Sequence, residues 1–256
     1  MRSSIDLNSD LGEGGAFDDQ LLSLVTSANI ACGFHAGDAD TIRRTVARAQ
    51  AQAVAVGAHP SLFDRENFGR TELPVVPEQV YDAVSYQLGV FQAIAEKLGV
   101  PVNHVKPHGA LYNMAARTPS LADAVVRAVA AADSTLLLFG PERSAFAESS
   151  RAHGVRMVAE VFADRGYTRQ GALVGRGQPG ALLSDPEMAA ERVLTMVRYG
   201  KVYSVDNHQL EIKAETVCVH GDTPGAVDFA RALRQKLEQQ GIRIRSPIRA
   251  ADNRVG

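Results

Sequence analysis

Acidic and basic side chains follow short apolar runs at several places in this chain. The first example is IDLNSDLGEG, residues 5–14, where a run typical of a buried strand continues into Asp10 and Glu13. The residues found in such positions are Asn8, Asp10, Glu13, His35, Asp38, His59, Lys106, His108, Glu160, Asp164, Arg165, His220 and Asp222. Because carboxylates and imidazoles transfer protons or ligate metals in many enzymes, this recurrence indicates a chemical site.

A proton-transfer step near neutral pH needs a carboxylate or an imidazole that faces the reacting group. We expect catalytic roles for Asp10, Glu13, His35, His108 and Glu160. His59 is an alternative base, and the sequence does not rank these six residues. A single aspartate or histidine is more often a helix cap or a structural group, so the prediction depends on the recurrence and not on any one residue.

The segment NHVKPHGALYN, residues 103–113, is the best candidate for ligand binding. Lys106 ends an apolar run and precedes Pro107, which cannot continue a strand ladder, so we expect the lysine at a strand end. Either Lys106 or Arg165 offers a cation to an anionic ligand. The residues that we expect to bind the ligand are Asn8, His59, Lys106, Tyr112, Asn113, Arg165 and His220.

Two other patterns carry less weight. GRGQPG, residues 175–180, matches the dinucleotide pattern GxGxxG, but no strand leads directly into it and no helix opens from it. We interpret it as a glycine-rich loop that could lie against phosphate. The sequence also lacks GxxxxGK[ST], so an ATP site would not be a P-loop. We expect Cys32 to be buried near the site and not to act as a nucleophile.

These side chains need a scaffold that brings strand ends together. Apolar and β-branched runs predict strands at residues 5–8, 28–32, 53–58, 102–106, 135–139, 157–162 and 216–220. Helical periodicity, with typical start and stop residues, predicts helices at residues 40–52, 77–98, 121–132, 144–152, 186–199 and 226–239. Such alternation is typical of parallel strands whose C-terminal ends form one edge, so we expect an α/β fold with the candidate residues at that edge.

Two further segments complete the predicted organisation. Residues 242–245 are a candidate eighth strand, and KVYSVDNHQLEIK, residues 201–213, predicts a hairpin that turns at Asp206 and Asn207. The sequence contains no internal repeat or low-complexity linker. We therefore expect one domain over residues 1–256.

Composition indicates a small-molecule ligand. With 256 residues, 45% of them hydrophobic, the chain can bury a large core. Its net charge is −2 and its cations are scattered, so we expect no nucleic-acid partner. Neither a signal peptide nor a bilayer-spanning run is apparent, so we expect no membrane association. The two cysteines, Cys32 and Cys218, form no CxxC pair, which favours a reduced, cytoplasmic protein.

Seven motifs in order resemble the LamB/YcsF family over residues 5–241. They are DLNSDLGE, NIACGFHAGD, GAHPSLFDRENFGR, VKPHGALYN, EVFADRGY, LVGRGQPGALL and VCVHGDTPGAV. The resemblance implies a distorted seven-stranded (β/α) barrel, similar to polysaccharide-deacetylase-like barrels. It also implies a hydrolase that uses ATP, with Mg²⁺, to open the cyclic amide 5-oxo-L-proline to L-glutamate, together with partner subunits B and C.

Two alternative functions remain open at the level of sequence. One is a metal-dependent deacetylase or amidohydrolase that uses Asp10 and the histidines as ligands, although the sequence contains no HExxH motif. We expect no protein-bound metal in the reaction, because ATP can activate the lactam without one. The other is a non-catalytic subunit that binds the lactam and docks its partners.

Overall fold

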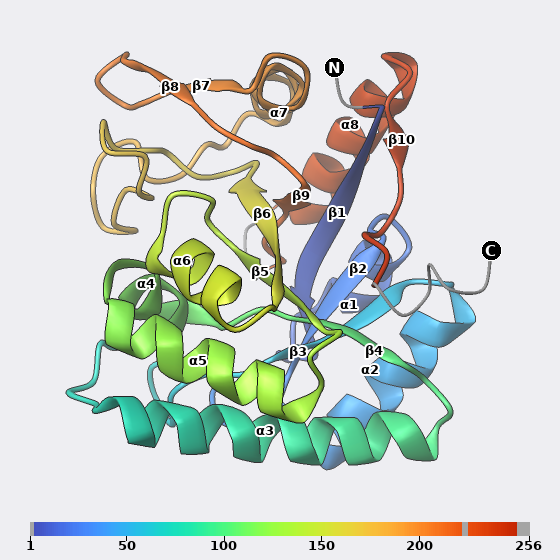
Figure 1. Ribbon diagram of the computed structural model, residues 1–256. Helices are drawn as coiled ribbons and strands as arrows, with labels where there is room; N and C mark the ends of the chain where they lie inside the picture. The colour runs from blue at the N-terminus through green and yellow to red at the C-terminus, as the bar shows by residue number, and fades with distance from the viewer. Residues whose placement is uncertain (1–2, 222–224, 250–256) are drawn as a thin grey trace.

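Parallel strands rich in apolar and β-branched residues form a closed barrel in the computed structural model, which describes residues 3–221 and 225–249 (Figure 1). In the described residues, the barrel strands are β1 (Ser4–Leu11), β2 (Ser27–Ala31), β3 (Ala55–His59), β4 (Val102–Val105), β5 (Leu137–Gly140), β6 (Arg156–Phe162) and β9 (Thr216–Cys218). They pair in that order, and β9 pairs with β1 to close the barrel. The predicted seven-stranded parallel barrel is confirmed.

Strand β1 shows how the barrel divides its side chains. Successive residues of a strand point to opposite faces. Ile5 and Leu7 belong to the apolar core beneath the helices. Asp6, Asn8 and Asp10 instead bond to side chains from other barrel strands. The barrel interior beside β1 is therefore polar, and the main apolar core lies between the strands and the surrounding helices.

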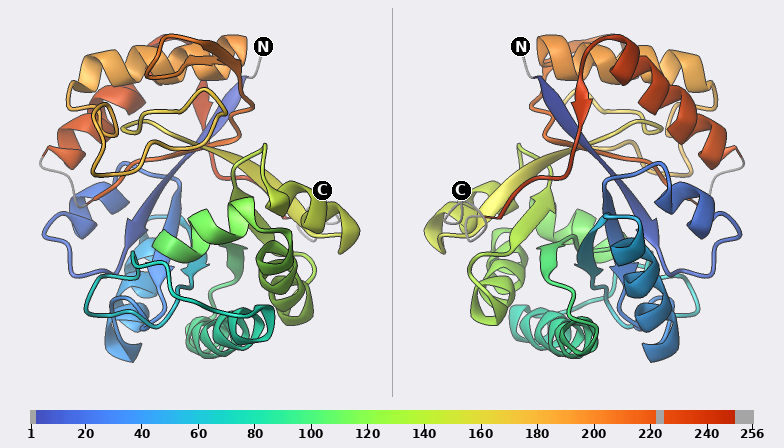
Figure 2. Two further views of the ribbon diagram at one scale, coloured as in Figure 1. Left: turned by 90° about the vertical axis from the view of Figure 1, so that its left-hand side faces the viewer. Right: turned by 90° about the vertical axis from the view of Figure 1, so that its right-hand side faces the viewer.

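Helices surround the barrel (Figure 2). In the described part of the chain they are α1 (Asp18–Leu22), α2 (Ala39–Ala51), α3 (Pro77–Lys97), α4 (Gly109–Arg117), α5 (Pro119–Ala132), α6 (Ala145–Ala152), α7 (Pro186–Tyr199) and α8 (Ala226–Gln239). The six predicted helices are present within a few residues of their expected bounds. Helices α1 and α4 were not predicted. Helix α1 has only five residues, and α4 begins shortly after Pro107 at an N-cap residue whose side chain makes no capping bond.

Two further predictions, the hairpin and the additional strand in the C-terminal third of the chain, are confirmed. Strands β7 (Lys201–Tyr203) and β8 (Gln209–Glu211) pair antiparallel, and Asn207 in their turn has φ of 61°. Strand β10 (Arg243–Ile244) lies beside β1 as an additional strand. The hairpin lies against the long segment between β6 and α7, where the backbone of Val205 bonds to that of Tyr167 (Figure 1).

Four strand boundaries differ from the prediction by two or more residues. Strand β1 continues to Leu11 and not to residue 8, so Asp10 lies within the strand, and β9 ends at Cys218 and not at residue 220. The starts of β3 and β5 differ for local reasons. Strand β3 begins at Ala55 and not at residue 53, because Ala53 takes a positive φ of 55° in the preceding turn. Strand β5 begins at Leu137, because Thr135 is held in a turn by the Asp133 carboxylate. Neither of these two later starts moves a candidate site residue.

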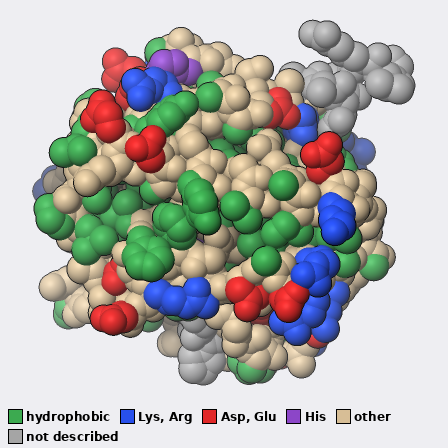
Figure 3. Space-filling view, turned by 90° about the horizontal axis from the view of Figure 1, so that it is seen from below, with side chains coloured by type: hydrophobic (Ala, Val, Ile, Leu, Met, Phe, Trp, Pro, Cys, Tyr) green, Lys and Arg blue, Asp and Glu red, His purple; other side chains and the backbone are tan. Residues whose placement is uncertain are grey.

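The surface carries one visible concentration of apolar side chains on the face of α3 (Figure 3). Tyr86 and Val90 of α3 are exposed, and Phe34 contacts both Tyr86 and the exposed Phe63. None of the helices in the described ranges is both long enough and apolar enough to cross a membrane.

Candidate functional site

A cavity of about 710 Å³ lies at the C-terminal ends of the barrel strands. Its walls come from the strand ends, from α4, from the segment after β6 and from the hairpin. The expected site residues that line it are Asp10, Glu13, His59, Lys106, His108, Tyr112, Asn113, Glu160, Arg165 and His220. Asn8 lies beneath the cavity in the barrel interior, and His35 lies behind Glu13 on a second cavity of about 570 Å³. The structure thus brings the expected residues together at one end of the barrel.

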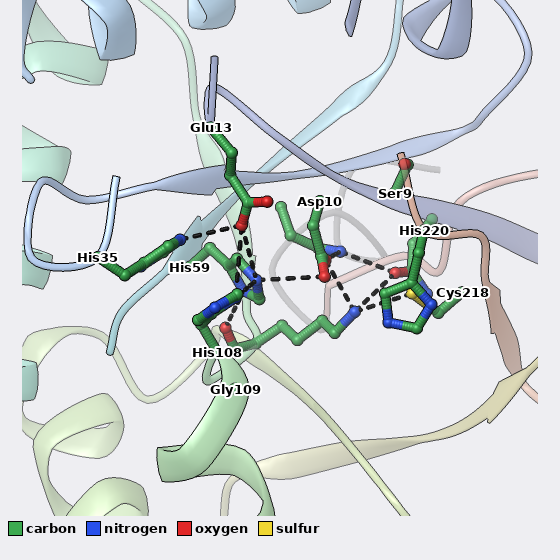
Figure 4. A network of polar contacts seen from close by, with 12 residues as sticks. Ser9, Asp10, Glu13, His35, His59, His108, Gly109, Cys218 and His220 are labelled. Atoms are coloured by element: carbon green, nitrogen blue, oxygen red, sulfur yellow. Dashed lines mark hydrogen bonds and ion pairs between the residues drawn. The ribbon is translucent and has the colours of Figure 1, made fainter. Parts of the chain in front are cut away.

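Glu13 and three histidines form one cluster in this wall, seen at the left of Figure 4. Glu13 Oε1 lies 2.9 Å from His35 Nε2, 3.4 Å from His108 Nδ1 and 3.8 Å from His59 Nε2. The rings of His35 and His108 stack in parallel with centroids 3.8 Å apart. Burial lowers the pKa of His35 to about 3 and that of His108 well below its usual value, so both rings are neutral at neutral pH.

Lys106 forms a second cluster with two carboxylates. Its Nζ lies 2.8 Å from Asp10 Oδ1, 3.0 Å from Glu160 Oε1 and 3.1 Å from Cys218 Sγ. Burial opposes a charged lysine, but Asp10, followed by Cys218 and Glu160, raises the pKa of Lys106 well above its usual value. Burial likewise opposes the Asp10 carboxylate, but His59 and Lys106 hold its pKa well below the usual range. Lys106 and Asp10 are therefore a buried ion pair.

A chain of hydrogen bonds supports this ion pair from inside the barrel. Asn29 Nδ2 donates to Asp10 Oδ1 at 2.8 Å and to Asn8 Oδ1 at 2.7 Å. Asn8 Nδ2 in turn donates to Glu160 Oε1 at 3.1 Å, and His104 Nε2 lies 2.7 Å from Asn29 Oδ1. Asn29 and His104 were not among the sequence candidates, because they lie within strands and not after them. Polar residues alternate with other residues at positions 6, 8 and 10, and this pattern was the sequence signal that could have predicted polar side chains inside the barrel.

Asp164 and His220 form a third pair on the opposite side of Asp10. His220 Nδ1 lies 3.0 and 2.9 Å from the two carboxylate oxygens of Asp164. Burial alone would raise the pKa of Asp164, but His220 lowers it below the usual range. Since an ionised carboxylate only accepts hydrogen bonds, His220 donates from Nδ1 and its Nε2 is free to face the cavity that it lines. The Phe162 ring stacks against the imidazole.

Tyr112 and Glu160 present polar atoms on the cavity wall. The Tyr112 hydroxyl and Glu160 Oε2 are buried, and neither has a well-aligned hydrogen-bond partner within residues 3–221 and 225–249. Burial first, and the nearby Glu160 second, raise the pKa of Tyr112 well above its usual value. The tyrosine is therefore a neutral donor beside a carboxylate acceptor.

Arg165 holds the segment after β6 in place. It donates from Nη2 to the carbonyl of Val174 at 2.6 Å and from Nε to the carbonyl of Ala181 at 3.2 Å. The glycine-rich loop, residues 175–180, is neither preceded by a strand nor followed by a helix start, and Gly175 and Arg176 line the cavity. This geometry is unlike a dinucleotide-binding loop, as predicted.

The remaining candidates have structural roles or lie outside the description. Asp38 caps helix α2 by accepting from the backbone N–H of Thr41 at 2.8 Å. Cys32 is buried, which raises the pKa of its thiol to about 12, so it is no nucleophile at neutral pH. The Asn113 side chain donates to the Gly109 carbonyl within α4. Asp222 lies outside the described residues.

Sequence comparison places the chain in a known family. The model of the LamB/YcsF family matches residues 5–252. The chain belongs to the LamB/YcsF family. A relative from Erwinia tasmaniensis, named as the A subunit of 5-oxoprolinase, is 50% identical over 242 residues, which cover 94% of this chain and 99% of the relative. This membership confirms the resemblance seen in the seven sequence motifs.

Solved structures agree with the LamB/YcsF assignment. The crystal structure of a lactam utilization protein from Thermus thermophilus is 43% identical, with a TM-score of 0.89, over 95% of this chain and all of that one. A family 4 carbohydrate esterase from Streptomyces lividans is 9% identical, with a TM-score of 0.52, over 96% of this chain and 92% of that one. The second likeness shows only that the barrel is shared with deacetylase-like proteins.

Proposed function

We propose that this chain is the A subunit of an ATP-dependent 5-oxoprolinase, which opens 5-oxo-L-proline to L-glutamate. The observation that carries the proposal is the relative of that name, which is 50% identical over almost its whole length. The name lactam utilization protein on the Thermus thermophilus structure supports the same substrate class. The cavity chemistry is consistent with a small cyclic amide that bears a carboxylate.

The amide edge of the lactam matches Tyr112 and Glu160. A five-membered lactam is a cis amide, so its N–H and its carbonyl oxygen lie side by side. The Glu160 carboxylate accepts from the N–H, and the Tyr112 hydroxyl donates to the carbonyl oxygen. Because these two buried atoms otherwise lack aligned partners within the described ranges, the lactam supplies the hydrogen bonds that they are missing.

The carboxylate of the substrate fits Arg165 better than Lys106. The charge of Lys106 is already balanced by Asp10 and Glu160 at 2.8 and 3.0 Å. The Arg165 guanidinium has five N–H donors. Its Nε and Nη2 each donate to a backbone carbonyl, so the remaining N–H groups can still bind a carboxylate in the cavity. In this proposal Lys106 keeps Asp10 ionised beside the substrate and holds Glu160 in place.

Coupling to ATP explains how a stable lactam is opened. Transfer of the γ-phosphoryl group of Mg-ATP to the lactam oxygen releases ADP and leaves a ring carbon that water attacks; loss of phosphate and cleavage of the ring C–N bond give glutamate. We propose that subunits B and C complete the ATP site, in the cytoplasm, where the free Cys32 and Cys218 stay reduced.

The attacking water needs a base, and His220 is oriented for that role. Asp164 fixes the His220 tautomer, so that Nε2 accepts a proton from water in the cavity. Of the five expected catalytic residues, Asp10 and Glu160 set the charge around Lys106. Glu13, His35 and His108 form the separate cluster on the other side of Asp10, in which Glu13 and His108 line the cavity and His35 supports Glu13 from behind.

Reconstitution tests the proposed function. The chain is mixed with subunits B and C, 5-oxo-L-proline and Mg-ATP, and glutamate and ADP are measured over time. We expect glutamate and ADP to rise together in the three-subunit mixture, and little of either product from this chain alone. A mixture that hydrolyses ATP normally but makes no glutamate from 5-oxo-L-proline would show that the proposed substrate is wrong.

A further inference from the structure

Backbone carbonyls fix the orientation of two imidazoles in the Glu13 cluster. His59 Nδ1 lies 2.6 Å from the carbonyl oxygen of Lys106, and His108 Nε2 lies 2.9 Å from that of Phe68. A carbonyl oxygen can only accept, so both of these nitrogens carry a hydrogen. His59 Nε2 and His108 Nδ1 are therefore the nitrogens that can offer a lone pair to an ion. These two lone-pair nitrogens lie only 2.9 Å apart.

Two carboxylates face the same point. Glu13 Oε1 lies 3.4 Å from His108 Nδ1 and 3.8 Å from His59 Nε2, and Asp10 Oδ2 lies 3.4 Å from His59 Nε2. Electron pairs that converge in a buried site repel one another unless a cation lies between them. Lys106 is turned toward the other oxygen of Asp10 and toward Glu160. Two carboxylate oxygens and two imidazole nitrogens therefore surround one point, as ligand atoms surround a metal ion.

We propose that Glu13, His59 and His108 bind a divalent transition-metal ion, with Zn²⁺ as the best match. Ligand atoms around tetrahedral zinc, at bond lengths of about 2.0–2.1 Å, are about 3.3 Å apart. The three separations here are 2.9, 3.4 and 3.8 Å. Two imidazole nitrogens and one carboxylate oxygen favour such an ion over Mg²⁺ or Ca²⁺, which prefer oxygen ligands.

His35 supports the site and is not one of its ligands. Its ring is parallel to that of His108, so its lone pairs cannot point in-plane at an ion that His108 binds in-plane. His35 Nε2 instead donates to Glu13 Oε1 at 2.9 Å. Each of the three ligands then has an outer hydrogen-bond partner, which is typical of protein metal sites.

The three ligands come from separate parts of the barrel, which explains why no single sequence motif contains all of them. Glu13 follows β1, His59 ends β3 and His108 immediately precedes α4 (Figure 4). The proposal differs from our expectation of a reaction without a protein-bound metal, which was based on activation of the lactam by ATP. All three ligands line the main cavity, where a bound ion would act as a Lewis acid.

Metal binding can be measured without lactam or partner subunits, so its outcome is independent of the proposed function. The full chain is stripped with a chelator and titrated with Zn²⁺ by calorimetry, and the bound metal is counted by elemental analysis. We expect one Zn²⁺ per chain and a melting temperature that rises with Zn²⁺ concentration. Glu13→Gln and His108→Ala should each weaken Zn²⁺ binding by more than the about 10–100-fold that loss of an outer-shell partner costs, because both residues are proposed as direct ligands.

Two control variants locate the ion. His153→Gln changes a histidine outside the cavity, and Cys218→Ser alters the neighbouring group of Asp10, Cys218 and His220, which could also hold a metal. Both controls should bind Zn²⁺ like the unmutated chain. Binding lost in Cys218→Ser, binding unchanged in a folded Glu13→Gln variant, or no stoichiometric Zn²⁺ on the unmutated chain would each overturn the proposal. Circular dichroism establishes that each variant is folded.

Discussion

The Asp164 carboxylate determines which nitrogen of His220 faces the cavity. Both carboxylate oxygens lie within 3.0 Å of His220 Nδ1, and Asp164 is almost fully buried. An aspartate that holds one tautomer of a histidine leaves the other nitrogen available as a base. Asp164 does not line the cavity, so its role in the proposed mechanism is to position His220.

Replacing Asp164 by asparagine tests this positioning role. The asparagine amide can donate to Nδ1, which favours the opposite tautomer and places a hydrogen on Nε2. In the reconstituted complex we expect Asp164→Asn to lower kcat by about 10²-fold or more, while KM changes little. The pH dependence of kcat should also change, which a loss of stability alone would not cause. An unchanged kcat would contradict the role of His220 as the base.

At the scale of elements, the contact between β3 and β4 depends on one glycine. Gly57 of β3 is paired with His104 of β4, and a Cβ placed on Gly57 would lie 2.1 Å from His104 Nε2. The imidazole occupies the space that a side chain would need, and it stacks on Phe139 of β5. The glycine thus allows His104 to reach Asn29 in the barrel interior.

We expect Gly57→Ala to destabilise the protein, because the methyl group and the His104 ring cannot both fit. Overpacking of this kind costs about 1–3 kcal/mol of unfolding free energy. Urea unfolding of the variant measures the loss, and Gly89→Ala on α3, where a Cβ meets nothing within 4 Å, is the matched control. Equal stabilities for Gly57→Ala and the unmutated chain would show that His104 moves aside at no cost.

The elements were predictable from the sequence to different degrees. Strand β6 is a largely apolar run, and α3 begins at Pro77, so local patterns were sufficient for both elements. Helix α4 was missed because its N-cap residue, His108, makes no side-chain capping bond. Local sequence contains no signal for that helix start.

The candidate site was predictable as a set of residues but not as a set of pairs. Asp164 and His220 each follow a predicted strand. Because the C-terminal ends of parallel strands lie at one edge of a barrel, the sequence predicted that both residues lie at that edge. Their pairing joins residues 56 positions apart and depends on how β6 and β9 lie side by side. The same limit applies to the contact between Lys106 and Glu160 across the barrel.

At the scale of the whole molecule, the polar barrel interior links stability to pH. Burial, followed by the nearby Lys106, lowers the pKa of His104 to about 3 from its usual value of 6.5. Burial also raises the pKa of Asp6 to about 6 from its usual 3.8. The two groups act in opposite directions between about pH 6 and 4, so the pH dependence of the unmutated protein alone would not separate them.

A difference measurement with His104→Gln isolates the histidine. Between pH 6.5 and 3 the unfolded chain binds a proton at His104 that the folded chain does not, so His104 favours folding less as pH falls through this range. The glutamine amide can still donate to Asn29 but does not titrate, and Asp6 contributes equally to both proteins. We therefore expect the unfolding free energy of the unmutated protein, relative to His104→Gln, to fall by about 2–3 kcal/mol between about pH 7 and pH 4.5. Urea unfolding at several pH values in that range measures the difference, and a difference that stays constant with pH would mean that His104 takes up a proton inside the folded barrel.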